Sequence, residues 1–173
     1  MAGDGCDASC ACESAPCQFT VSSSVRLASV VSALHPGATL TLASGSYKGS
    51  GVCGWRLPSG AGAGDSPITV RGPSTGAAPV VDCDHVGPVV DGVLRGVHLR
   101  LEGILFTNAY ISGGSGGIAR AELGSRIVVA NCRFSASSTD RQGGAIFVRH
   151  SNSSLVISGS HFEENVAEDE GYE

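Results

Sequence analysis

Three segments of the chain repeat one pattern: His98-Leu-Arg-Leu-Glu-Gly-Ile-Leu-Phe106, Arg126-Ile-Val-Val-Ala-Asn-Cys-Arg-Phe134 and Ser154-Leu-Val-Ile-Ser-Gly-Ser-His-Phe162. The phenylalanines that close them recur at an equal interval of about 28 residues, which lies within the range of known structural repeats. Apolar residues recur seven and five positions before each phenylalanine, and this alternate spacing is typical of a β-strand. A fixed period with apolar residues in matching positions indicates a stacked repeat architecture.

The composition of each repeat indicates which kind of stack the chain forms. No unit carries the i, i+3, i+4 pattern of a helix, and Gly, Ser and Asn separate the short apolar runs. Each turn would therefore consist of strands and bends, with every strand pairing in parallel with its equivalent in the next turn. The sequence predicts an all-β fold, a right-handed parallel β-helix in which one repeat forms one turn.

Earlier strands are expected to extend the same stack. Leu40 and Leu42 precede Ile68 and Val70 by one such period, and the step from Ile68 to Leu99 is three positions longer. A further strand is expected around residues 79–84. The glycine-rich segment between residues 48 and 65 is expected to project as a loop.

The two ends of the chain differ from the repeats. Residues 1–23 form a Cys-rich leader, and residues 24–173 are predicted to form the β-helix domain. Residues 24–35 have helical spacing, with Ser23 or Ser24 as N-cap, and this short helix would cover one open end of the stack. At the other end no capping segment is recognisable. We expect further β-helix turns or another subunit to stack there, and the chain to be a truncated part of a longer product.

Composition and charge exclude several classes of function. A length of 173 residues fits one domain, and 25 glycines suit a fold with many tight bends. The net charge of −5, with eleven scattered Lys and Arg, argues against a nucleic-acid partner. No apolar run is long enough to predict a transmembrane segment.

The seven cysteines predict the compartment. A zinc cluster near the N-terminus is less favoured than disulfides, because paired Cys-x2-Cys motifs and a nearby His are missing. Disulfides imply an extracellular or cell-surface location. Cys132 is expected to be a buried free thiol, and Cys53 with Cys83 is one reasonable pairing, although the spacing leaves the connectivity open. The cysteines expected in disulfides are Cys6, Cys10, Cys12, Cys17, Cys53 and Cys83.

Two sets of motifs resemble known β-helix families over residues 25–165. The first resembles the opening of pectin-lyase-like right-handed β-helix proteins, and consists of residues 27–33, 36–37, 40–42, 45–47, 67–72 and 79–82. The second, Gly143-Gly-Ala-Ile146 followed by Phe162-Glu-Glu-Asn165, resembles the GGA(I/V/L)…FxxN repeat of chlamydial polymorphic outer membrane proteins. The preceding turn departs from it, because Ser137 stands where this repeat has Asn.

The repeat motifs also have a structural interpretation. Gly143 and Gly144 would permit a sharp bend and close approach of the backbone. Phe106, Phe134 and Phe162 would fill the interior and stack on one another. Asn165 would bond the backbone of the stacked turn.

The resemblance to β-helix enzymes implies where a catalytic site would lie. Polysaccharide lyases and hydrolases of this fold place carboxylates, often with Ca²⁺, and a basic residue on one face. The candidates here are Asp82 and Asp84, as Ca²⁺ ligands or an acid/base pair, with Arg71, Arg95 or Arg100 stabilising an enolate-like intermediate. The simpler interpretation is that both aspartates are solvent-facing residues of an alternating strand. The Gly-His-Gly and Arg-Ile-Lys signatures of galacturonan hydrolases are missing.

Two further residues carry open alternatives. Asn152 begins an Asn-Ser-Ser glycosylation sequon, which has meaning in a eukaryotic secreted protein. Trp55 would either stack on a sugar ring or anchor its loop.

These observations predict a non-catalytic, secreted or cell-surface β-helix module for adhesion or glycan contact that needs no cofactor, with Ca²⁺ as the one metal that Asp82 and Asp84 could bind. The alternative is a pectate-lyase-type enzyme that acts on acidic glycans. A third interpretation is a structural spacer.

Overall fold

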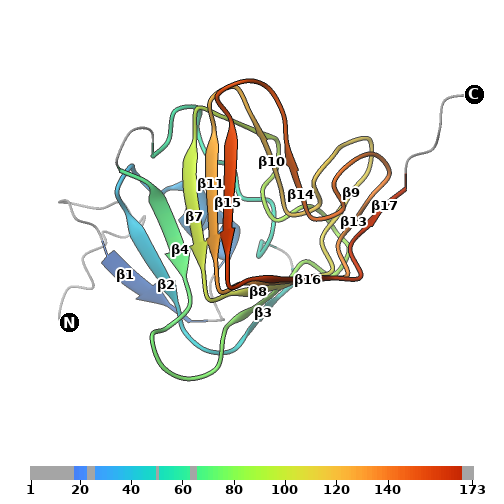
Figure 1. Cartoon of the computed structure of the whole chain (residues 1–173). Coiled ribbons are helices and arrows are strands. Elements are labelled where there is room, and N and C mark those ends of the chain that lie inside the picture. The colour runs from blue at the N-terminus through green and yellow to red at the C-terminus, as the bar shows by residue number, and fades with distance from the viewer. Residues whose placement is uncertain (1–17, 23–25, 50, 63–65, 169–173) are drawn as a thin grey trace, which may run out of the picture.

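The structure is a computed structural model that describes residues 18–22, 26–49, 51–62 and 66–168. It confirms an all-β fold, a parallel β-helix in which equivalent strands of successive turns pair side by side (Figure 1). The strand pairs are parallel, as expected when the chain returns to the same sheet only after a complete turn.

Four sheets form the walls. Sheet 1 contains β1 (Gln18–Val21), β2 (Thr39–Leu42), β4 (Ile68–Arg71), β7 (His98–Glu102), β11 (Arg126–Ala130) and β15 (Ser154–Ser158). Sheet 2 contains β3 (Ser46–Lys48), β5 (Val80–Asp82), β8 (Leu105–Thr107), β12 (Arg133–Ser135) and β16 (His161–Glu163). Sheet 3 contains β9 (Tyr110–Ile111), β13 (Ser138–Thr139) and β17 (Val166–Ala167). Sheet 4 contains β6 (Val93–Arg95), β10 (Ala119–Glu122) and β14 (Ile146–Val148).

Alternate residues of these strands fill the interior. In β7 and β11 the apolar positions of the repeat are fully buried, while the residues between them face outward. The phenylalanines form the expected ladder, with ring centroids 5.4 Å apart for Phe106 and Phe134 and 4.7 Å apart for Phe134 and Phe162. Residues that are one repeat apart in the sequence are therefore paired with each other in the interior of the stack.

The register of the early turns is confirmed at one step and corrected at another. Ile68 pairs with Leu99, as the longer spacing between them predicts. Leu40 pairs with Val70 and not with Ile68, so the prediction of a one-period step between β2 and β4 is wrong by two positions. A shift of two keeps the same side chains inside the sheet, and for this reason the apolar pattern alone does not distinguish the two registers.

The N-terminal part differs from the prediction in two respects. Gln18–Val21, which lies within the predicted Cys-rich leader, forms β1 and pairs with β2. The helix expected over residues 24–35 is present as α1 (Leu27–Ser32), and its N-cap is Arg26. Ser23, Ser24 and residues 1–17 lie outside the described residues, so the pairing of the four N-terminal cysteines and the division into leader and domain stay predictions.

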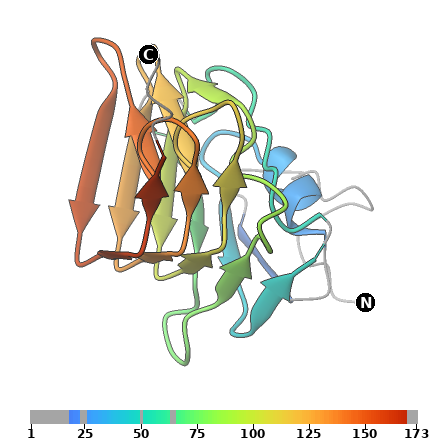
Figure 2. The ribbon, with the colours of Figure 1, turned by 90° about the vertical axis from the view of Figure 1, so that its right-hand side faces the viewer.

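Helix α1 lies at the end of the stack opposite to β15 (Figure 2). Leu27 and Val31 on one side of the helix are fully buried and belong to the same apolar cluster as the β-helix interior. The expectation that a short amphipathic helix covers this end agrees with that burial.

The segment between residues 48 and 65 was expected to project, and this prediction is wrong for Trp55 and its neighbours. Trp55 is fully buried, forms a parallel bridge with Val90, and contacts the edge of the Phe106 ring with centroids 6.0 Å apart. Its Nε1 donates to the Val52 carbonyl over 2.7 Å. A large apolar ring with a satisfied N–H is stable inside the stack, so this segment forms part of the wall.

The disulfide between Cys53 and Cys83 is present, which confirms the pairing named as reasonable from the sequence. It joins the Trp55 segment to the residue that follows β5, with Cα atoms 5.5 Å apart. Cys132 is a buried free thiol, also as predicted. Within the described part of the chain, no helix has the length and apolar character needed to span a membrane.

Candidate functional site

The two aspartates singled out from the sequence meet around a lysine. Asp82 is the last residue of β5, and Asp84, two positions later, adopts a left-handed conformation with φ of 53°. The Asp84 backbone N–H donates to Asp82 Oδ1 over 2.9 Å. Lys48 Nζ, from the end of β3, lies 3.2 Å from Asp82 Oδ2 and 2.9 Å from Asp84 Oδ1. Asn108 Nδ2 donates to Asp82 Oδ1 over 2.9 Å.

This arrangement shifts the pKa values of Asp82 and Lys48 away from neutrality. Burial by itself would raise the pKa of Asp82, but hydrogen bonds from Asn108, the Asp84 N–H and Lys48 outweigh it, and the pKa of Asp82 is lowered. Hydrogen bonds to Asp84 and Asp82 raise the pKa of Lys48. The lysine and the two aspartates therefore form a cluster of paired opposite charges at physiological pH.

The same cluster is a poor calcium site. Ca²⁺ takes six to eight oxygen ligands, whereas both carboxylates here are already bound to one ammonium group. Among the described residues, no group of three or more His, Cys, Asp or Glu side chains converges to hold a metal. The carboxylates present do not fit the Ca²⁺ that the resemblance implies.

The candidate arginines lie on other sheets. Arg71 Nε donates to Thr41 Oγ1 over 3.2 Å, and Arg100 pairs with Glu102, all on sheet 1. Arg95 ends β6 on sheet 4. The structure thus brings Asp82 and Asp84 together but places the three arginines apart from them.

A second polar cluster, which the sequence analysis did not identify, lies on the outer side of sheet 4. Glu122 at the end of β10 is in register with Arg95, and the N–H of Arg149 donates to the Ala121 carbonyl beside it. Two positions before Glu122, Arg120 is in register with Phe147. We call this surface the Glu122 face, and it comprises Arg95, Arg120, Glu122, Phe147, Arg149 and His150.

Glu122 is the most buried charged group of this face, with a side chain only 5% exposed. Its Oε1 accepts hydrogen bonds from Arg120 Nε over 2.9 Å and from Arg120 Nη2 over 2.6 Å. Arg149 Nη2 lies 3.4 Å from Oε1, and His150 Nδ1 lies 3.5 Å from Oε2. The hydrogen bonds from Arg120 first, and the charges of Arg120, Arg149 and His150, lower the pKa of Glu122 despite its burial.

Phe147 adds an aromatic ring to the face. Its neighbours Ile146 and Val148 pack against the apolar interior, so Phe147 alternates to the outside of β14. The guanidinium carbon of Arg120 lies 5.8 Å from the centre of the Phe147 ring, a cation–π distance. The face therefore combines a partly exposed ring with fixed hydrogen-bond donors, and the side chains of Arg149 and His150 are 54% and 38% exposed.

A signal for this face exists in the sequence. Arg95, Glu122 and Arg149 recur at one constant interval, and Val93, Arg120 and Phe147 recur at the same interval. This interval is one residue shorter than the period of the phenylalanine ladder. An alignment on the phenylalanines alone therefore places the residues of sheet 4 out of step.

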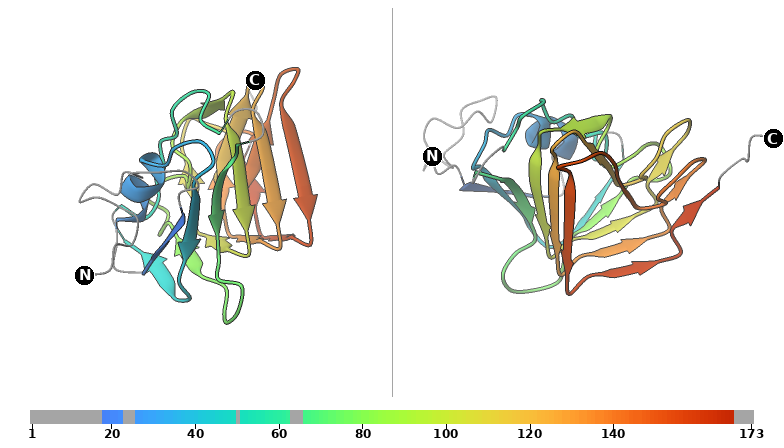
Figure 3. Two further views of the ribbon diagram at one scale, coloured as in Figure 1. Left: turned by 90° about the vertical axis from the view of Figure 1, so that its left-hand side faces the viewer. Right: turned by 45° about the horizontal axis from the view of Figure 1, so that its top comes forward.

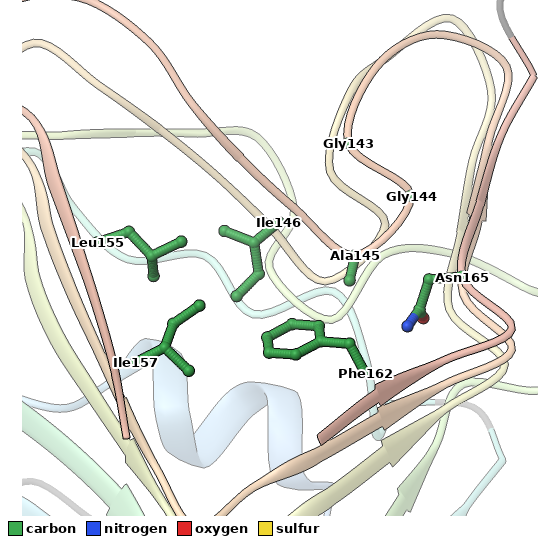
Figure 4. A pocket seen from close by; sticks show the side chains of 8 residues that line it. All are labelled: Gly143, Gly144, Ala145, Ile146, Leu155, Ile157, Phe162 and Asn165. Carbon is green, nitrogen blue, oxygen red and sulfur yellow. The ribbon is translucent and has the colours of Figure 1, made fainter. Parts of the chain in front are cut away.

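The repeat-motif residues line a pocket at the end of the stack (Figure 4). Gly143 has φ of +66°, and a Cβ on Gly144 would lie 2.7 Å from the backbone of Val166, so both glycines have the role predicted for them. Asn165 accepts from the Ser137 N–H over 3.1 Å and donates to the Phe134 carbonyl over 2.9 Å. These bonds between turns agree with the structural interpretation of the motif.

The structure decides one of the two alternatives left open by the sequence. Burial of Trp55 excludes it as a sugar-stacking platform and agrees with its role as an anchor. Asn152 is exposed in a turn with φ of 67°, and its glycosylation stays a prediction.

The sheets define the chain as a parallel β-helix protein. Comparisons with models of known protein families, with curated proteins and with solved structures found no match.

Proposed function

We propose that this chain is a secreted or cell-surface β-helix module that contacts glycans without catalysing a reaction. It would be a pectin-lyase-like β-helix with repeats of the polymorphic outer membrane protein type. The Cys53–Cys83 disulfide supports an oxidising compartment, and the cross-turn bonds of Asn165 support the repeat assignment.

The observation that carries the proposal is the Glu122 face. A sugar ring has an apolar C–H face and a rim of hydroxyl groups, so it binds where an aromatic ring lies beside fixed donors and acceptors. Phe147 supplies the ring, and the exposed side chains of Arg149 and His150 supply donors that the buried Glu122 carboxylate holds in place. The face lies on a sheet wall of stacked parallel strands, which suits an extended chain of sugars (Figure 3).

The pKa directions support binding over catalysis. A general acid or base acts best with a pKa near the working pH. The pKa values of Asp82 and Glu122 are lowered and that of Lys48 is raised. Each of these pKa values therefore lies further from neutral pH than that of an unperturbed group. Charged groups of this kind are suited to hold a ligand.

Glycan-array screening followed by titration calorimetry tests the proposal. We expect Phe147→Ala and Arg149→Ala to weaken binding of the selected glycan by about tenfold or more, since one stacking or charged contact contributes roughly 1–2 kcal/mol. Tyr110→Ala is the control for the ring, because Tyr110 is an exposed aromatic on sheet 3. Arg133→Ala is the control for the charge, since its side chain is 53% exposed and also pairs with a glutamate. Binding to no glycan, or equal losses in variants and controls, would contradict the proposal.

One observation favours the lyase-type alternative, namely that Asp82, Asp84 and Lys48 meet at one site. Ultraviolet absorbance of an unsaturated uronate product, measured on acidic polysaccharides with and without Ca²⁺, tests it. A signal that Asp82→Ala abolishes would replace the binding proposal by the enzyme. We expect folded protein to give none.

A further inference from the structure

The last described turn leaves the same end of several sheets unpaired within the described part of the chain. In their sheets, β14, β15, β16 and β17 are terminal strands, and all four belong to the end of the stack opposite to α1 (Figure 3). Ile157 is 46% exposed and Phe162 is 39% exposed, whereas Val129 and Phe134, which occupy the same positions one turn earlier, are fully buried. This end therefore presents apolar side chains together with the hydrogen-bonding edge of a strand.

Strand β15 lacks the features that usually protect an edge. Exposed edge strands generally carry charges, prolines or bulges that prevent pairing with another chain. The three preceding strands of sheet 1 carry outward charges, namely Arg71 in β4, Arg100 in β7 and Arg126 in β11. By contrast, β15 reads Ser-Leu-Val-Ile-Ser and carries no charge. An uncharged apolar edge of this kind is suited to pair with a further strand.

The opposite end of the stack presents a different surface in the described residues. There α1 buries Leu27 and Val31 against the interior, and in Figure 4 the helix lies behind the pocket, at the far end of the interior. At this end β1 is the terminal strand of sheet 1, so a head-to-tail contact would join β15 to the β1 edge of the next copy and build a longer series of copies. A contact between the β15 ends of two copies is isologous, and it closes at two.

The sequence of β15 is self-complementary about its centre. Ser154 and Ser158 flank Leu155 and Ile157 symmetrically around Val156. When two such strands pair antiparallel about Val156, Leu155 lies opposite the partner's Ile157, and directly opposed residues face the same side of the sheet. Inward apolar residues then meet inward apolar residues in both copies.

We propose that two copies of this chain associate head to head, with β15 pairing antiparallel to the partner's β15 across a two-fold axis at Val156. The pairing continues sheet 1 from one copy into the other and covers Ile157 and Phe162 of both. It goes beyond the proposed glycan contact, because the Glu122 face points outward from sheet 4, whereas the dimer contact forms along the β15 edge of sheet 1.

Sedimentation equilibrium of the full chain tests the stoichiometry. We expect a monomer–dimer equilibrium for the wild type and a monomer for Val156→Lys, which would place two ammonium groups side by side at the axis. Val156 is 45% exposed, so the lysine is compatible with the folded chain. Val128→Lys is the matched control, because Val128 holds the same outward position one turn earlier and pairs with Val156. It should remain dimeric, and circular dichroism verifies that both variants are folded.

The register is tested by crosslinking. A cysteine at the axis lies opposite its own copy, within reach of a disulfide. We expect Val156→Cys to form a covalent dimer under mild oxidation and Val128→Cys to stay monomeric on a non-reducing gel. A wild type that is monomeric at every concentration would overturn the proposal and leave a further β-helix turn as the occupant. Assemblies that grow beyond two copies would overturn the two-fold arrangement. So would a dimer that Val156→Lys does not weaken and Val156→Cys does not crosslink.

Discussion

Two adjacent turns with the same motif have different surroundings. Phe134 and Phe162 occupy one position of the repeat and stack on each other at 4.7 Å. Phe134 lies between two phenylalanines and is fully buried, whereas Phe162 stacks on the Phe134 ring alone among the described residues and is 39% exposed. The repeat specifies which side chain points inward. Whether a further turn stacks on that side chain decides how deeply it is buried and how much it contributes to the stability of the fold.

This comparison predicts the largest difference between variants. Phe134→Ala removes a ring from a closed ladder and leaves a cavity, so it should lower the free energy of unfolding by about 3–5 kcal/mol. Phe162→Ala should cost about half as much or less, because part of its ring already faces solvent. Urea denaturation followed by circular dichroism measures both, at a protein concentration low enough to keep the chain monomeric. Equal losses of unfolding free energy in Phe134→Ala and Phe162→Ala would show that the end turn is covered in solution.

The N-terminal turns contrast with the repeats because a disulfide links them and the spacing between their paired residues is less regular. The Cys53–Cys83 bond closes a segment with a sequence separation of 30. Replacing both residues by alanine should lower stability by about 3–4 kcal/mol, chiefly because the unfolded chain gains freedom. Thermal unfolding of the variant under oxidising conditions measures this loss. A variant as stable as the wild type would mean that Trp55 and its neighbours hold this wall without the bond.

On sheet 4 the buried carboxylate of Glu122 joins two turns, because it contacts Arg120 of its own strand and Arg149 of the next turn. The pKa of Glu122 is lowered in the folded chain, so its ionised form stabilises the fold above its unfolded pKa of about 4.3. This contribution is lost as the pH falls through the lower folded pKa. Glu122→Gln should therefore cost roughly 1 kcal/mol at pH 7, below the usual value for hydrogen bonds to a charged group, because solvent screens its partly exposed arginine partners.

The same loss should shrink below about pH 4. Denaturant titrations of wild type and variant at the two pH values measure it. A loss that does not change with pH would mean that the amide fails for reasons of packing and not of charge.

The smallest effect concerns the reactivity of a thiol. Burial raises the pKa of Cys132 to about 11. The native thiol should therefore resist a thiolate-selective reagent at pH 8, where the unperturbed pKa of about 8.5 would allow reaction. Ser160 holds the same position in the end turn and is only partly buried, so Ser160→Cys should react readily in native protein. Equal rates for the two thiols would contradict the difference between the turns.

Contacts between equivalent residues of successive repeats could be predicted from the sequence. Contacts between residues that do not belong to the repeat could not. The ladder of Phe106, Phe134 and Phe162 follows from one spacing. Lys48 contacts Asp82 from the preceding strand of sheet 2, and the repeat pattern does not predict this pair. The Glu122 face was missed because the corners of the turn shorten the period of sheet 4 by one residue.

Sequence by itself determined that this protein is a parallel β-helix, because inward apolar residues at a constant interval are satisfied only when like strands stack. It also determined the glycine bends and the Asn165 bonds, since both depend on local backbone geometry. Only the tertiary structure decided that Leu40 pairs with Val70, that Trp55 lies inside the wall, and that Arg120 and Arg149 surround Glu122. These features depend on loop lengths and on burial summed over several turns, and neither quantity is encoded in a two-residue alternation or a single repeat.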